Sequence, residues 1–136
     1  MLLADRHDGL RDGVRGLLDE VFESVFMVAN EASLLEGAGR LKPGVVVLDL
    51  SLAKGDMPGL LRRVAERSPA SKILVLSVHD EPTVTESALA SGAEAVVLKS
   101  MLASDLLPAI DALRAGRRYV SWAVERRPKA RKEDAE

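Results

Sequence analysis

Three short apolar runs constrain the fold of this 136-residue chain more than any other feature, because each ends in a polar residue of a different chemical kind. Each run has four residues drawn from Val, Ile, Leu and Ala, and the residues that follow the runs are Asp49, Ser77 and Lys99. Continuous apolar runs rich in β-branched residues are typical of strands buried on both faces, as in a parallel sheet. The pattern therefore predicts an α/β fold.

The polar residues at the ends of these runs predict where the chemistry lies. In an open parallel sheet, ligands bind at the carboxyl ends of the strands. There the Asp49 carboxylate would supply a nucleophile, the Ser77 hydroxyl a hydrogen-bond donor and the Lys99 ammonium a partner for an anion. The sequence thus predicts a site for a phosphoryl group.

The segments between the runs have helical periodicity, so strands and helices alternate along the chain. The expected strands cover residues 1–4, 25–29, 45–49, 73–76 and 95–98, and the first helix covers roughly residues 9–23. Five strand–helix units predict a parallel sheet with helices on both faces, joined by right-handed crossovers. Residues 1–120 would form this domain. Residues 121–136 carry both charge signs without apolar periodicity and would form a disordered tail.

Composition excludes several classes of site. The chain has no cysteine, which rules out disulfides, thiolate catalysis and Cys-ligated zinc. A formal net charge of −2 gives no overall attraction for nucleic acid or an anionic membrane, so neither partner is expected. No apolar run approaches the length of a membrane span. A soluble cytoplasmic protein is expected.

The order and kinds of these residues resemble the receiver domain of bacterial response regulators. That family has a flavodoxin-like (βα)5 three-layer sandwich with a five-stranded parallel sheet in the order 2-1-3-4-5. The resemblance covers about residues 1–120 and rests on Asp5 after the first strand together with Asp49, Ser77 and Lys99. The segments Leu-Ser-Val-His-Asp, Leu-Lys-Ser and Gly-Arg-Arg-Tyr-Val are similar to the subclass that usually carries a helix-turn-helix output domain. No such domain follows, so a stand-alone receiver is expected.

The resemblance implies a role for each matching residue. Asp49 would accept the phosphoryl group, Lys99 would pair with it, and Ser77 would hydrogen-bond it and carry the switching movement. Asp5, Asp49 and the backbone carbonyl of Ser51 would hold Mg²⁺. The donor would be a histidine kinase or phosphotransfer protein, and the output would lie in another protein. A homodimer through the last helix and the fifth strand is also consistent with the family.

Three departures from the family pattern bear on these roles. The loop between the acceptor and Gly59 is about two residues longer than usual, and Val96 stands where the family has an aromatic switch residue. Arg6 occupies the position of a second metal-binding acid. A guanidinium beside the site would weaken or displace Mg²⁺ by repulsion, or replace it by pairing with a carboxylate. Alternatively, Asp8 or Asp56 could supply the missing ligand.

The residues leave two main functions open. The first is a receiver that accepts a phosphoryl group on Asp49 and switches a protein-interaction face. The alternative is a pseudo-receiver, an interaction module independent of phosphorylation and metal, which Arg6 and Val96 favour. An enzyme is not expected: a hydrolase or nucleotide-binding enzyme would need a Gly-rich loop after the first strand or a serine–histidine arrangement, and neither is present.

Overall fold

The computed structural model describes residues 1–5, 16, 25–78 and 81–121. The strands are β1 (Leu2–Ala4), β2 (Phe26–Val28), β3 (Val45–Asp49), β4 (Lys72–Ser77), β5 (Ala95–Leu98) and β6 (Tyr119–Val120). The helices are α2 (Glu31–Leu41), α3 (Met57–Arg67), α4 (Pro82–Ala90) and α5 (Leu102–Arg114), with short 3-10 helices η1 (Leu50–Ala53) and η2 (Lys99–Met101). Apart from Gly16, the helix predicted over residues 9–23 lies outside the described residues. So do Arg6, Asp8 and residues 122–136 of the tail predicted over residues 121–136, whose first residue, Ser121, is described and buried.

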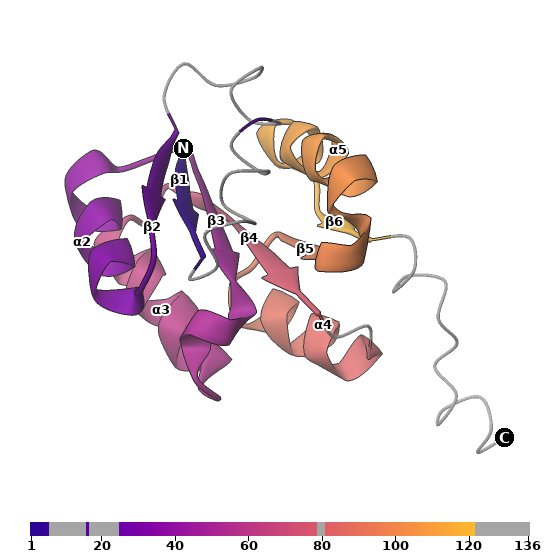
Figure 1. The fold of residues 1–136 in the computed structure, drawn as a ribbon, viewed down its shortest axis with the longest axis horizontal. Coiled ribbons are helices and arrows are strands. Elements are labelled where there is room, and N and C mark those ends of the chain that lie inside the picture. The colour runs from indigo at the N-terminus through magenta and orange to yellow at the C-terminus, as the bar shows by residue number, and fades with distance from the viewer. Residues whose placement is uncertain (6–15, 17–24, 79–80, 122–136) are drawn as a thin grey trace, which may run out of the picture.

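The sheet separates two apolar layers, as the continuously apolar strands predict (Figure 1). Alternate residues of each strand face opposite sides. On β3, Val46 and Leu48 pack with α2, α3 and Ala88 of α4, whereas Val45 and Val47 pack with α5. The three-layer arrangement is therefore confirmed. Among the residues that the structure describes, no helix combines the length and apolar character needed to cross a bilayer.

The strands are all parallel and lie in the order β2-β1-β3-β4-β5-β6. The predicted order 2-1-3-4-5 is confirmed, and a sixth strand that the sequence did not predict is added at the edge. In β6, Tyr119 pairs with Ala95 and Val120 pairs with Val96. The next residue, Ser121, is fully buried: its amide donates to the Val96 carbonyl at 3.0 Å and its Oγ accepts from the Leu98 amide at 2.8 Å.

The amino ends of β3 and β4 are closed by uncharged groups. The Ser71 hydroxyl donates to the Pro43 carbonyl. It is also 2.6 Å from the Ser68 hydroxyl, which must then be the donor because Ser71 has only one hydroxyl hydrogen. Both serines are buried. The Lys72 amide donates to the Gly44 carbonyl at 2.9 Å, so local hydrogen bonds hold the amino ends of β3 and β4 together.

Candidate functional site

The predicted site residues lie at one edge of the sheet. Asp5 follows β1, Asp49 ends β3, Ser77 ends β4 and Lys99 follows β5. The register places Asp49 opposite Leu76 and Ser77 opposite Leu98, so the four residues occupy neighbouring strand ends. The amide of Asp5 also donates to the Val28 carbonyl at 3.1 Å, which fixes the backbone at the end of β1. The predicted convergence at the carboxyl edge is confirmed.

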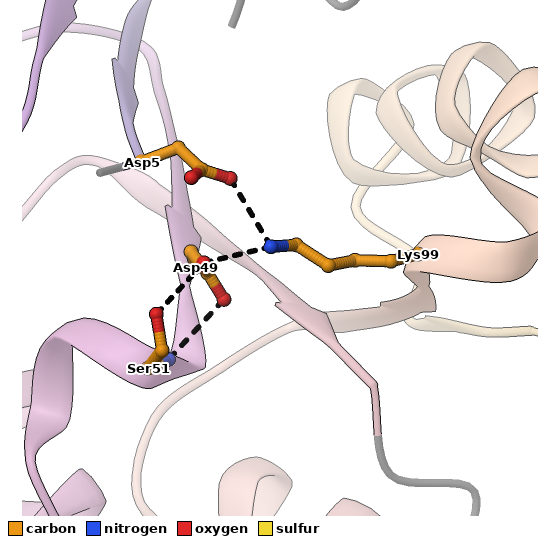
Figure 2. A network of polar contacts seen from close by, with 4 residues as sticks. All are labelled: Asp5, Asp49, Ser51 and Lys99. Carbon is orange, nitrogen blue, oxygen red and sulfur yellow. Dashed lines mark hydrogen bonds and ion pairs between the residues drawn. The ribbon is translucent and has the colours of Figure 1, made fainter. Parts of the chain in front are cut away.

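Lys99 joins the two carboxylates (Figure 2). Its Nζ donates to Asp49 Oδ2 at 2.7 Å and lies 3.4 Å from Asp5 Oδ2. The side chains of Asp5 and Asp49 are 1% and 4% exposed, and that of Lys99 is 16% exposed. Two buried carboxylates therefore share one ammonium, and these three side chains carry one excess negative charge when all are ionised. Such a group of charges attracts a further cation.

Asp49 is also held by the first turn that follows β3. The Ser51 hydroxyl donates to Asp49 Oδ2 at 2.8 Å, and the Ser51 amide donates to Asp49 Oδ1 at 3.2 Å. Burial raises the pKa of Asp49, but the hydrogen bonds from Lys99 and Ser51 and the charge of Lys99 outweigh burial, so its pKa lies below the usual value. The carboxylate is therefore ionised at neutral pH, as a nucleophile must be.

A pocket of about 620 Å³ opens above Asp49. Its lining combines the polar side chains of Asp49, Ser51, Lys54, Ser87 and Lys99 with the apolar side chains of Leu50, Ala53, Met57, Pro58, Val78 and Val84. The pocket lies between the loop that follows β3 and helix α4, which supplies Val84 and Ser87. An anionic group entering from solvent can therefore reach the Asp49 carboxylate and the Lys99 ammonium together.

The remaining predictions have different outcomes. Ser77 is fully buried and is not among the side chains that line the pocket. Asp56, considered as a replacement metal ligand, instead caps α3: its Oδ1 accepts from the Gly59 amide at 3.1 Å. Val96 lies in the core with 1% exposure.

The hydroxyl of Ser51 was missed as a site group. The two-residue separation from an acid, which allows an Asx-type contact, could have revealed it.

Asp5 and Asp49 are the carboxylates of the site that a divalent cation could reach. Asp5 and Asp49 supply the hard oxygen ligands that Mg²⁺ prefers, so they fit such an ion in kind. Within residues 1–5, 25–78 and 81–121, no group of three or more His, Cys, Asp and Glu side chains could hold a metal ion. The backbone carbonyl of Ser51 accepts a hydrogen bond from the Lys54 amide at 3.4 Å, which is long enough to leave capacity for a cation.

Comparison with known proteins agrees with this geometry. The nitrate/nitrite response regulator NarL of Escherichia coli is 36% identical over 135 residues, covering 91% of this chain and 58% of that protein. The transcriptional regulatory protein DegU of Brevibacillus brevis is 29% identical over 122 residues, covering 88% and 52% respectively. The isolated receiver domain of RcsB from Salmonella enterica superimposes with a TM-score of 0.78 and 28% identity, covering 92% of this chain and 94% of that one.

These comparisons separate the two functions left open by the sequence. The chain spans just over half the length of NarL and DegU. Both are regulatory proteins, and the relatives give no support to a module that is independent of phosphorylation. The profile of the response regulator receiver domain matches residues 1–111. The chain therefore belongs to the response regulator receiver domain family and is a receiver domain of two-component signal transduction.

Proposed function

We propose that Asp49 is the residue that accepts the phosphoryl group in this receiver domain. The observation that carries this proposal is the position of its ionised carboxylate, which ends β3, lines the pocket and lies 2.7 Å from the Lys99 ammonium. Receiver domains interact with histidine kinases or phosphotransfer proteins. We therefore expect a phosphohistidine of such a protein, in the cytoplasm, to be the donor. The cognate donor would be identified by its phosphohistidine and by a surface that fits this pocket.

The transfer forms one bond and breaks one. A carboxylate oxygen of Asp49 attacks phosphorus, while the phosphorus–nitrogen bond of the donor breaks and its imidazole nitrogen leaves with the electron pair. The Lys99 ammonium offsets negative charge on the phosphoryl oxygens, and the Ser51 hydroxyl keeps the carboxylate oriented. The chain acts here as the acceptor of one group. It is a signalling domain, and we do not assign it an enzymatic activity.

We propose that Ser77 carries the switching step. It ends β4 directly beside β5 and is fully buried. A phosphoryl group on Asp49 would offer its hydroxyl new acceptor oxygens, and the loop after β4 would follow that hydroxyl. The equilibrium between the inactive and active conformations of the face formed by α4, β5 and α5 would then shift.

Receiver domains generally bind Mg²⁺ at the phosphorylation site. In this chain the ion would be held by Asp5, Asp49 and the backbone carbonyl of Ser51, and when bound it neutralises charge between carboxylate and phosphate. We propose that Arg6 lowers Mg²⁺ affinity, because it replaces an acid with a positive charge next to Asp5 in the sequence. Arg6→Asp is therefore expected to bind Mg²⁺ more tightly in a fluorescence or calorimetric titration, and equal affinities would refute this role of Arg6.

The output partner is a further part of the proposal. NarL and DegU are regulators that are longer than this chain, and RcsB has been solved as dimers bound to DNA. We propose that residues 1–120 do not contact DNA themselves, given the formal net charge of −2 for the chain, and that they act through another domain or protein. A homodimer through α5 and β5 stays a prediction. The backbone edge of β5 is covered by β6.

Intact mass measurement tests the acceptor. The full chain is incubated with acetyl phosphate and Mg²⁺ beside Asp49→Asn, and one phosphoryl adduct that hydroxylamine removes is expected on the parent chain alone. Hydroxylamine sensitivity identifies an acyl phosphate. An adduct of equal yield on Asp49→Asn would move the acceptor elsewhere, and the absence of any adduct on the parent would refute the proposal.

A further inference from the structure

The loop after β3 presents a lysine to the pocket from a fixed backbone. Leu52 and Ala53 are buried, and Lys54 and Gly55 then both adopt left-handed conformations with φ of 50° and 88°. The turn is closed by the Asp56 amide, which donates to the Ala53 carbonyl at 2.9 Å. This is the segment in which the sequence is about two residues longer than the family pattern. The backbone of Lys54 is thus anchored on both sides while its side chain lines the pocket.

Within residues 1–5, 16, 25–78 and 81–121, no hydrogen bond or ion pair engages the ammonium of Lys54, whereas the ammonium of Lys99 is shared by two carboxylates. Asp56, the nearest acid along the sequence, is engaged elsewhere. Its Oδ1 accepts from the Gly59 amide at 3.1 Å, and its Oδ2 lies 3.9 Å from Arg63. Lys54 is therefore exposed and available to an anion that enters the pocket.

The negative charge of the phosphorylated site explains what the ammonium of Lys54 could do. A phosphoryl group carries about two negative charges at neutral pH. Once it is on Asp49, it would lie beside the Asp5 carboxylate, and Lys99 contacts both acids. The single positive charge of Lys99 is smaller than the negative charge of this group. A second ammonium on a flexible four-carbon stem at the mouth of the same pocket reduces the excess.

We propose that Lys54 is a second phosphoryl-binding cation of this receiver domain. Its ammonium pairs with phosphoryl oxygens as the donor enters and after the acyl phosphate has formed. It therefore favours binding of the donor and stabilises the phosphorylated product. This inference rests on the proposed role of Asp49. It makes the longer loop a binding element that supplies positive charge beside an acidic pair.

The experiment compares three variants of the full chain. Lys54→Gln removes the charge, Lys54→Arg keeps it, and Arg62→Gln removes one charge from an exposed position on α3 that does not line the pocket. The second-order rate constant of phosphorylation by acetyl phosphate is expected to fall about five-fold in Lys54→Gln, as for a charge contact near 4 Å in largely aqueous surroundings. Lys54→Arg and Arg62→Gln should stay near the parent value. Equal rates for Lys54→Gln and the parent, or an equal loss in Arg62→Gln, would overturn the inference.

A binding measurement separates failure of this inference from failure of the proposed acceptor. Inorganic phosphate is titrated into Asp49→Asn with and without Lys54→Gln, and amide chemical shifts around the pocket are followed by NMR. The added Lys54→Gln change should weaken phosphate binding by about five-fold at low salt, with a smaller difference at high salt. Unchanged affinity would reject Lys54 as an anion-binding residue, whatever the phosphorylation assay shows.

Discussion

The two ends of the sheet bury different kinds of polar group. At the amino end, the hydroxyls of Ser68 and Ser71 and the carbonyl of Pro43 are buried together without any charge. At the carboxyl end, Asp5 and Asp49 are buried together and share Lys99. The first arrangement has no charged group, whereas Asp5, Asp49 and Lys99 of the second carry more negative than positive charge. This difference indicates that the amino end stabilises the fold, whereas the carboxyl end is arranged to bind a ligand.

The ion pair near the amino end sharpens this contrast. Lys72, the first residue of β4, lies 3.2 Å from Glu94, with side chains 42% and 33% exposed. This pair is balanced and solvated, so it contributes little to stability. At the carboxyl end, Lys99 and its two carboxylate partners are buried, so removing one of these side chains should lower the free energy of unfolding substantially. Variants at both ends test whether the two really differ in this way.

The largest effect is expected for Lys99→Met. This change leaves two buried carboxylates facing each other without their shared ammonium, and it should lower the free energy of unfolding by about 3 kcal/mol at neutral pH. Phosphorylation of Asp49 should also be lost. Urea unfolding followed by circular dichroism measures the change. If Lys99→Met were as stable as the parent chain, the carboxyl end would not be held by this contact.

A smaller effect is expected for Ser71→Ala at the other end. The Pro43 carbonyl and the Ser68 hydroxyl would lose their buried partner, which should cost about 2 kcal/mol in the free energy of unfolding. The rate of phosphorylation by acetyl phosphate should not change, because the site lies at the opposite edge of the sheet. A large loss of labelling in folded Ser71→Ala protein would show that the two ends are coupled.

Acid should weaken the contribution of Asp49 at the carboxyl end. Because the pKa of Asp49 is lower in the folded chain than in the unfolded one, its ionised form stabilises the fold. This contribution is fully present above the unfolded pKa of about 4 and is lost as the pH falls through the folded value. Denaturation midpoints measured from neutral pH to about pH 3 should therefore fall less in Asp49→Asn than in the parent. Parallel curves would contradict the assigned pKa direction.

The smallest effect is expected for Lys72→Gln. Its partly exposed contact with Glu94 should be worth about 0.5 kcal/mol, and salt should reduce the difference further. Thermal unfolding at low and high ionic strength would measure it. A loss comparable to that of Lys99→Met would remove the distinction between a solvated pair and a buried one.

The sequence was sufficient for features that depend on local pattern and parallel pairing. Apolar runs gave the interior strands, and the polar residue after each run predicted that Asp49 and Lys99 would meet, because parallel strands end at the same edge. It was insufficient for β6, whose two residues are too few to show an alternating pattern. The position of Asp56 illustrates a different difficulty. An acid before a helix can either cap it or bind a cation, and only the folded loop decides between them.

The hydrogen bond between Ser121 Oγ and the Leu98 amide has a mechanical consequence. Leu98 directly precedes Lys99, so a displacement of the backbone at Ser121 is transmitted through one hydrogen bond to the residue beside the ammonium. The same bond would act in the opposite direction, because a movement of Lys99 toward a bound anion would displace Leu98 and, through it, Ser121. A polypeptide cut before Tyr119 would lose this link and leave the Leu98 amide without its acceptor. Expressed fragments of this domain should therefore include Ser121 if the position of Lys99 is to be preserved.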